Sequence, residues 1–241
     1  MREIFKRVED DISIKIEVDI DASSYKESNS WLFSVFIKFD GFDENIEGYE
    51  EFLETKESLI IALEHEDRAK FVGYRVNDGW SELYFYAVAS KYLDATVSKI
   101  LASSDYVYES NVVRDTRWDF YETQLYPTEL EFCHIQSAKI ISFLLEENDD
   151  LDISRTVEHY IIFDTNTQKE RFIANILTKD FEYKDDISSE DYDHGVALSK
   201  KHKVTQEEVR EVVEILFKEL KKEHGNYEGW STILAENIKE D

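Results

Sequence analysis

The order in which strand-like and helix-like patterns follow one another constrains the fold of this chain more than any other feature. In the second half, apolar residues recur first with the period of a strand and then with the period of a helix, in the order β-α-β-β-α-β. The predicted strands there are 157–163, 181–187, 195–200 and 230–234, and the predicted helices are 167–178 and 205–223. This order is that of a ferredoxin-like sandwich, in which two helices cover an antiparallel sheet.

The first half of the chain repeats this order from Trp31 to Leu125. Strands are predicted at 12–20, 31–39, 71–76, 80–89, 106–113 and 118–125, and helices at 47–66 and 94–102. Asp78-Gly79 lies between two of these strands and predicts a tight hairpin, because both residue types tolerate a positive φ. We therefore expect the α+β fold class, with two ferredoxin-like α/β sandwiches that have antiparallel sheets.

A further helix is predicted at 128–147, where Thr128 and Glu131 have the spacing of a capping box. Asn148-Asp149-Asp150 then interrupts the helical repeat with residues that favour turns. This interruption predicts a boundary, with an N-terminal domain at 1–150 and a C-terminal domain at 151–241. Divided there, the first domain has 33 acidic and 15 basic residues, and the second has 21 and 13. The acidity is then concentrated in the first domain.

Several predicted strands are apolar on both faces, although helices cover only one face of a ferredoxin-like sheet. Tyr84 and Tyr86 lie on the second face in the first domain, and Tyr160 and Ile162 lie on it in the second. Left bare, such faces would exceed the apolar patches that monomers usually expose. We expect the two sheets to cover each other, or a second copy of the chain to cover them.

The chain has 54 acidic and 28 basic residues, a net charge of −26. Such a surface repels phosphate groups, which argues against direct binding of nucleic acid or of anionic membranes. No stretch approaches the roughly 20 apolar residues of a membrane-spanning helix, and the first residues lack the apolar segment of a signal peptide. Because Cys133 is the single cysteine, no intrachain disulfide can form, and we expect a cytoplasmic protein.

The sequence predicts no cofactor, metal or catalytic centre. Its seven glycines form neither a G-x-G-x-x-G nor a P-loop pattern. His194 and His202 flank a predicted strand without the spacing of a metal motif. Cys133 and His134 are adjacent in a predicted helix, so their side chains point about 100° apart. A carboxylate–histidine pair, such as one that includes His159, stays open as a catalytic alternative.

The most distinctive local motif is Gly225-Asn-Tyr-Glu-Gly-Trp230. Gly225 follows a predicted helix and is expected to end it with a positive φ. We expect Trp230 to be mostly buried as an aromatic anchor. The alternative is an exposed turn that docks a partner, because Trp and Tyr are enriched in interface hot spots.

Two motifs in the second half resemble the regulator of ribonuclease activity B family. That family opens with a strand that carries His and Phe, and it closes with a Gly-Glu-Tyr-Asp-Gly-Trp turn. The residues that fall on its positions are His159, Phe163, Gly225, Tyr227, Gly229 and Trp230. Asn226 stands where the family has glutamate, and Glu228 stands where it has aspartate.

The first half is similar to the bacterial domain of unknown function 695, which is commonly joined to a regulator-like domain in this order. The residues that carry this similarity are Trp31 with Phe33, Glu50-Glu51-Phe52, Val72-Gly73, Asp78-Gly79, Tyr84-Phe85-Tyr86, Asp115-x-x-Trp118 and Leu125-Tyr126-Pro127. Together the two resemblances cover nearly the whole chain after Ile20.

The resemblance implies a ferredoxin-like core and a non-catalytic activity, in which the protein binds and modulates an RNA-degrading endoribonuclease. We therefore expect a non-enzymatic regulator or adaptor whose partner is a protein, such as a ribonuclease. The candidate partner-binding residues are His159, Tyr227, Glu228 and Trp230. Two alternatives stay open, namely an enzyme that uses a carboxylate–histidine pair and a protein with a purely structural role.

Overall fold

The computed structural model describes residues 1–9 and 12–235, and the chain divides into two compact units, Met1–Pro127 and Thr128–Asp241. Among the described residues, each unit contains one sheet, of six strands in the first and four in the second. Every pair of neighbouring strands in both sheets is antiparallel. The predicted α+β class with two antiparallel sheets is confirmed.

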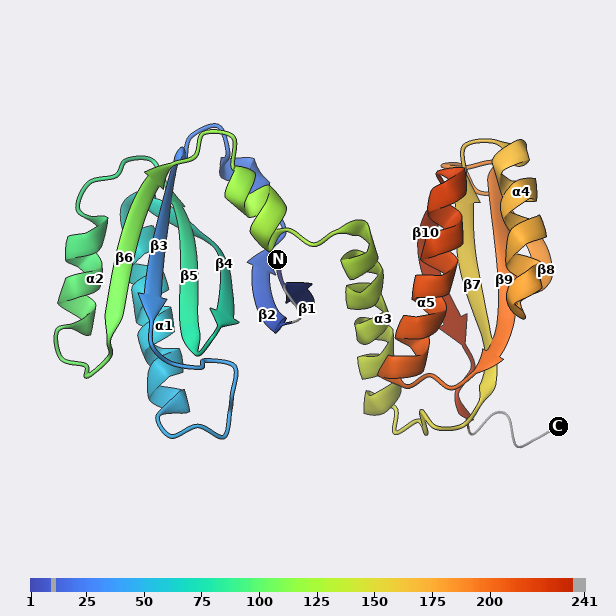
Figure 1. The fold of residues 1–241 in the computed structure, drawn as a ribbon, viewed down its shortest axis with the longest axis horizontal. Helices are drawn as coiled ribbons and strands as arrows, with labels where there is room; N and C mark the ends of the chain where they lie inside the picture. The colour runs from blue at the N-terminus through green and yellow to red at the C-terminus, as the bar shows by residue number, and fades with distance from the viewer. Residues whose placement is uncertain (10–11, 236–241) are drawn as a thin grey trace. The chain divides into compact units, whose positions relative to one another are not determined.

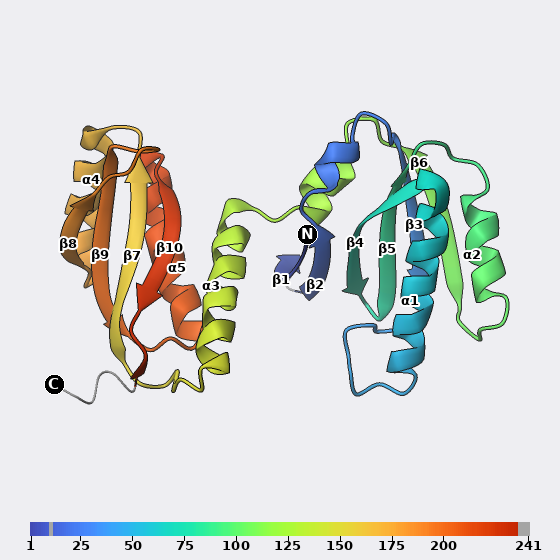
Figure 2. The same cartoon turned by 180° about the vertical axis from the view of Figure 1, so that it is seen from behind.

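The second unit has the strand order of a ferredoxin-like fold. Its elements are α3 (Glu129–Glu146), β7 (Arg155–Phe163), α4 (Asn166–Ile176), β8 (Glu182–Ile187), β9 (His194–His202), α5 (Gln206–Leu220) and β10 (Asn226–Thr232). The sheet order is β10-β7-β9-β8, so the first strand of the β-α-β-β-α-β run lies between the fourth and the third. Helices α4 and α5 cover one face of this sheet, and α3 stands next to α5 (Figures 1 and 2).

The first unit repeats this arrangement and adds a hairpin. Its elements are β1 (Arg2–Glu9), β2 (Ile12–Asp19), β3 (Trp31–Ile37), α1 (Tyr49–Glu64), β4 (Ala69–Asn77), β5 (Trp80–Ala87), α2 (Leu93–Leu101) and β6 (Tyr108–Arg114). The sheet order is β1-β2-β4-β5-β3-β6. The last four strands in that order form the ferredoxin-like part, and the hairpin β1–β2 extends it beyond β4. Asp78 and Gly79 have φ of 49° and 70°, which confirms the predicted tight turn between β4 and β5.

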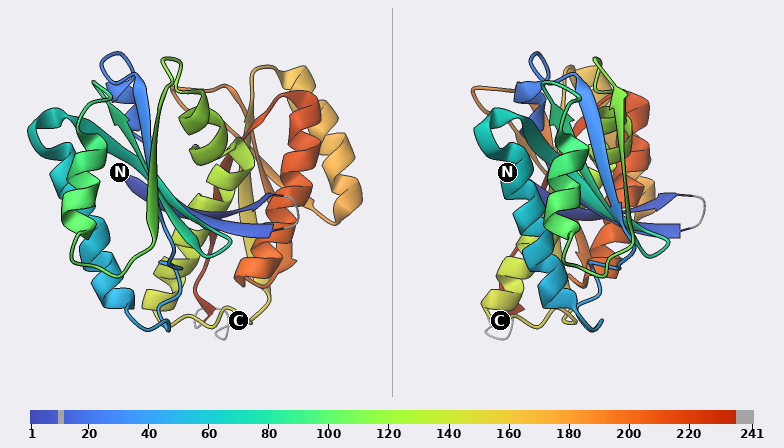
Figure 3. Two further views of the ribbon diagram at one scale, coloured as in Figure 1. Left: turned by 60° about the vertical axis from the view of Figure 1, so that its left-hand side comes forward. Right: turned by 90° about the vertical axis from the view of Figure 1, so that its left-hand side faces the viewer.

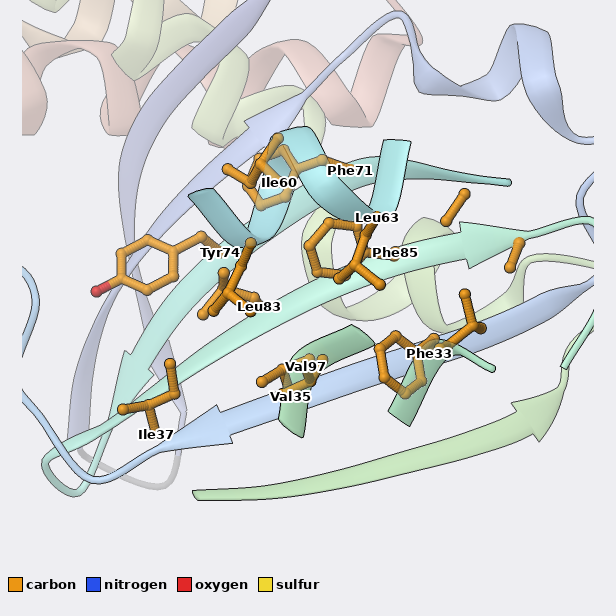
Figure 4. Packing of buried hydrophobic residues seen from close by; sticks show 14 of the residues in the cluster. Phe33, Val35, Ile37, Ile60, Leu63, Phe71, Tyr74, Leu83, Phe85 and Val97 are labelled. Carbon is orange, nitrogen blue, oxygen red and sulfur yellow. The ribbon is translucent and has the colours of Figure 1, made fainter. Parts of the chain in front are cut away.

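Helices α1 and α2 lie side by side on one face of the first sheet (Figure 3). Their apolar residues and those of β3, β4 and β5 form one buried cluster, in which Ile60 and Leu63 of α1 lie over Phe71, Leu83 and Phe85 of the sheet (Figure 4). A helix packs there because its apolar positions recur every three to four residues and so form one face.

The other face of the first sheet is covered by residues 118–125, which we predicted to be a strand. That prediction is wrong, because residues 119–125 form a helical turn. The Asp115 carboxylate accepts hydrogen bonds from the N–H groups of Asp119 and Phe120, which caps the first turn. Trp118 stacks on Tyr86 with ring centroids 3.9 Å apart, and Phe120 packs on Tyr84.

Tyr84 and Tyr86 are buried, and Phe120 and Trp118 of their own unit pack on them. In the second unit, Tyr160 and Ile162 are partly exposed, and the Tyr160 hydroxyl lies 2.8 Å from the Ser231 hydroxyl. That another surface covers this face of the second sheet stays a prediction.

Helix α3 packs within the second unit, whereas the predicted boundary near residue 150 put it in the first domain. Ile141 and Leu144 of α3 share a buried cluster with Val157, Val213 and Trp230. The turn at 148–150 therefore lies within one unit and is not a linker. Divided after Pro127, each unit has 27 acidic and 14 basic residues, so the net charge of each is 14 − 27 = −13. With this division the two units have the same net charge, so the predicted excess of acidic residues in the first domain is not found.

Candidate functional site

The segment Gly225–Trp230, here called the closing segment, leads from the end of α5 into β10. Gly225 does not have the positive φ that we predicted, because His224 takes the left-handed conformation, with a φ of 55°. Gly225 is instead tightly packed, since a Cβ there would lie 2.4 Å from the Phe163 ring and 2.8 Å from Leu220. The pairing of β10 with β7 shifts between Tyr227 and Gly229, so Glu228 is an extra residue at a bulge and is exposed.

Trp230 anchors the closing segment in the core, as predicted. Its side chain is 5% exposed, and its indole N–H donates to the Ser137 hydroxyl at 3.1 Å. Ser137 belongs to α3, so this hydrogen bond ties the helix to the last strand.

Tyr227 ends a buried chain of hydrogen bonds that begins in β9. His202 Nδ1 lies 2.6 Å from the Lys203 carbonyl, which can only accept, so this nitrogen carries the proton. In the neutral ring His202 Nε2 is then an acceptor, and it lies 3.4 Å from His159 Nε2, which donates. His159 Nδ1 accepts in turn from the Tyr227 hydroxyl at 2.8 Å. With this assignment, each ring nitrogen and the hydroxyl proton have a partner.

Burial disfavours the charged form of both histidines. His159 is fully buried, and desolvation, with smaller effects from His202 and Lys200, lowers its pKa to about 3. Desolvation also lowers the pKa of His202. Burial raises the pKa of Tyr227 well above its ordinary value, so the hydroxyl stays protonated and can donate.

The lowered pKa of His159 predicts a loss of stability in acid. Well above pH 6.5 the ring is neutral in both the folded and the unfolded chain, and its contribution is constant. Between pH 6.5 and pH 3 the unfolded chain binds a proton that the folded chain does not, so the free energy of unfolding falls. We expect His159 to contribute a loss of about 2 kcal/mol between pH 7 and pH 5, measured by urea unfolding. Titration of His159 in the folded protein, followed by NMR, should show no protonation above pH 5, and a midpoint near 6.5 would contradict this prediction.

Removal of the Tyr227 hydroxyl should destabilise the protein. In Tyr227→Phe the ring remains, but His159 Nδ1 becomes a buried acceptor without a donor. We expect a decrease of about 1–3 kcal/mol in the free energy of unfolding, measured with urea. Tyr183→Phe is the matched control, because that tyrosine is 47% exposed, and it should change stability by less than about 0.5 kcal/mol. Equal values for the two variants would show that the buried hydrogen bond has no net effect.

The closing segment forms one wall of a cleft of about 220 Å³ within the second unit. Side chains of α3 and α5 form the other walls. The lining residues are Glu129, Phe132, Cys133, Gln136, Ser137, Ile140, Phe217, Leu220 and all six residues of the closing segment. The lining is mainly apolar, and its two charged residues, Glu129 and Glu228, are both acidic. The cleft can therefore take one or two apolar side chains beside a positive charge.

The four candidate residues lie around this cleft at different depths. Tyr227 and Trp230 line it, with Tyr227 partly buried and Trp230 buried, and Glu228 lies exposed at its rim. His159 lies behind Tyr227 with no exposed surface, so a partner would contact it only if the fold opened. The residues that the motif did not indicate are those of α3 and α5. They are far from the closing segment in sequence, and only their apolar spacing distinguishes them.

The cleft contains no arrangement typical of an active site. His159 is hydrogen-bonded to a tyrosine and to another histidine, and not to a carboxylate. Desolvation raises the pKa of the Cys133 thiol to about 11, so the nucleophilic thiolate is scarce at neutral pH. In residues 1–9 and 12–235, no group of three or more His, Cys, Asp or Glu side chains could hold a metal ion. No helix in this described part of the chain is long and apolar enough to cross a membrane.

Comparison with known proteins assigns a family model to each unit. Residues 4–126 match the family of unknown function DUF695, and residues 134–232 match regulator of ribonuclease activity B. The two resemblances predicted from the sequence are thereby confirmed. No curated protein matches the chain. A crystal structure of an unknown protein from Galdieria sulphuraria matches with 10% identity and a TM-score of 0.22, over 86% of this chain and 99% of that one.

Proposed function

Because this chain belongs to the DUF695 family of unknown function and continues into a regulator of ribonuclease activity B domain, we propose that it is a non-enzymatic regulator that binds a protein partner. The partner that best fits the second match is a ribonuclease, whose activity the protein would modulate. A cytoplasmic location, expected from the single cysteine, is part of this proposal.

The cleft beside the closing segment carries the proposal. It is apolar inside and acidic at its rim, and the closing segment that forms one wall is the motif by which the regulator family was recognised. Interfaces commonly centre on such apolar pockets surrounded by polar residues. A protein that engages a nuclease here, with a net charge of −26, would compete with RNA for basic surfaces.

The enzymatic alternative finds less support. It needs a base within reach of a substrate, and His159 is buried with its hydrogen bonds satisfied by protein. A purely structural role offers no reason for an open apolar cleft.

Gln136→Trp tests the proposal, because Gln136 is exposed on α3 and its side chain lines the cleft, so a larger side chain fills the cleft without entering the core. Tagged protein is purified from its native host, and bound proteins are identified by mass spectrometry. We expect wild type to enrich a partner, a ribonuclease among the candidates, and Gln136→Trp to lose at least about nine-tenths of it, corresponding to about 1.4 kcal/mol. With the purified partner, wild type should change the rate of RNA cleavage and cleave no RNA alone.

Ala138→Trp is the matched control. Ala138 is exposed on the same helix and lies outside the cleft lining, so this variant should retain the partner. Equal enrichment by wild type and Gln136→Trp would place partner binding elsewhere. Cleavage of RNA by the protein alone would overturn the non-enzymatic proposal.

A further inference from the structure

In the described part of the second unit, the outer edge of β10 has no strand beside it. In the sheet order β10-β7-β9-β8, β10 pairs with β7 on one side, and in the described residues no strand pairs with its other side. An edge strand presents a row of unpaired N–H and C=O groups, which can pair with another extended chain.

Helix α3 lies over the position that such a chain would take. Figures 1 and 2 show α3 beside α5, on the side of β10 that lies away from the rest of the sheet.

The surface of α3 beside the cleft carries a row of residues that is apolar except for Gln136. Phe132, Gln136, Ile140 and Phe143 recur at helical spacing and share one side of α3. The first three line the cleft, and Phe143 continues the row with 58% of its surface exposed. An apolar row longer than the cleft fits a bound segment of several residues better than a single side chain.

The charge of the cleft lining indicates which kind of partner segment would bind there. No lysine or arginine lines the cleft, whereas Glu129 and Glu228 do. Lys221 forms an ion pair with Glu129. The second unit as a whole has a net charge of −13. A basic segment would therefore be attracted, and an acidic one repelled.

We infer that an extended segment of the partner protein, with alternating apolar side chains flanked by lysine or arginine, pairs with the outer edge of β10 beneath α3. Main-chain hydrogen bonds to β10 would hold the segment, and its apolar side chains would fill the cleft and contact the row on α3. The inference rests on the proposed function, because it specifies how the partner occupies the same cleft.

Random nine-residue peptides displayed on phage test this inference. They are selected on the wild-type protein, and the enriched sequences are made as synthetic peptides. We expect apolar residues at every second position, with lysine or arginine beside them. Glu228→Lys and Gln136→Trp should each weaken peptide binding at least tenfold, and Ala138→Trp should not. N-methylation of the peptide amides that face β10 should abolish binding, while methylation of the alternate amides should preserve it.

Several outcomes would overturn the inference. These are selection that enriches no peptide, enriched peptides without cations, and binding that survives N-methylation in both registers. Self-association of the wild type that Gln136→Trp abolishes would assign the edge to a second copy of the chain. If any of these occurs while Gln136→Trp still loses the purified partner, the proposed function stands and only the extended segment is refuted. If Gln136→Trp retains the partner, partner binding lies outside the cleft and the extended segment is refuted with it, and if wild type enriches no partner, the proposed function itself fails.

Discussion

Asp149→Ala should lower the free energy of unfolding by about 3–5 kcal/mol, because it leaves a buried guanidinium without its counter-charge. Arg155 and Asp149 form an ion pair in which neither side chain has more than 1% of its surface exposed. The Arg155 guanidinium also donates to the carbonyls of Asp150 and Ile233, and Asp149 accepts from the Ala235 N–H at 2.9 Å. The pair thus ties the end of α3 to β7 and to the chain after β10. Urea unfolding measures the effect.

Two controls separate the buried charge from other effects. Asp152 forms an exposed ion pair with Lys203, so Asp152→Ala should cost less than about 1 kcal/mol. The double variant Asp149→Ala with Arg155→Met removes both charges and should recover part of the loss. A double variant less stable than Asp149→Ala alone would show that the remaining hydrogen bonds of Arg155, and not its unpaired charge, dominate.

Trp118→Ala should also cost about 3–5 kcal/mol, which is typical when a buried aromatic side chain is removed. Trp118 is fully buried, stacks on Tyr86, and donates its indole N–H to the Asn29 carbonyl at 2.6 Å. Its loss would open a cavity beneath the segment that covers the second face of the first sheet. Thermal unfolding and the near-ultraviolet circular dichroism of the aromatic cluster would report the change.

Trp80→Ala is the matched control for Trp118→Ala. Trp80 is only partly buried and lies at the start of β5, where Lys38 packs on its ring. It should cost about 1 kcal/mol. Equal losses for the two tryptophans would mean that Trp118 does not hold the covering segment in place.

The sequence predicted the helices and strands that depend on local residue patterns. The prediction failed where contacts between residues far apart in the sequence determine the structure. The strands and helices of both ferredoxin-like parts follow from apolar periodicity, and the hairpin at Asp78-Gly79 follows from its turn residues. β1 was not predicted, because some of its apolar side chains are exposed while a charged side chain is buried. Ile4 and Val8 are more than half exposed, whereas Glu3 is buried.

Residues 118–125 were mistaken for a strand because their aromatic side chains suit a strand equally well. The helical turn there depends on the Asp115 carboxylate and on Arg7, which donates to the carbonyls of Gln124 and Tyr126 from β1. The position of α3 was missed for a similar reason, since its contacts are with Val157, Val213 and Trp230, all beyond the turn that looked like a linker.

For the candidate site, the motif identified the closing segment and His159, but not the hydrogen bonds that join His159 to Tyr227 and His202. The spacing between His159 and His202 in the sequence has no meaning by itself, because the two rings meet only through the pairing of β7 with β9. The walls that α3 and α5 contribute were equally hidden, because Phe132 and Phe217 are ordinary apolar positions of two separate helices.

The hydrogen-bonded row from the Lys203 carbonyl to Tyr227 also restricts how this protein can evolve. His202 and His159 each donate to one neighbour and accept from the next, and the Tyr227 hydroxyl donates to His159, so the row has a direction, and a residue that lacks either a donor or an acceptor at position 202 or 159 breaks one of its two bonds. A substitution at one position changes the cost of substitution at the other two, which is strong epistasis. We expect the three to be inherited together or replaced together by apolar residues, and a relative with only one of them changed should carry a compensating donor or acceptor nearby.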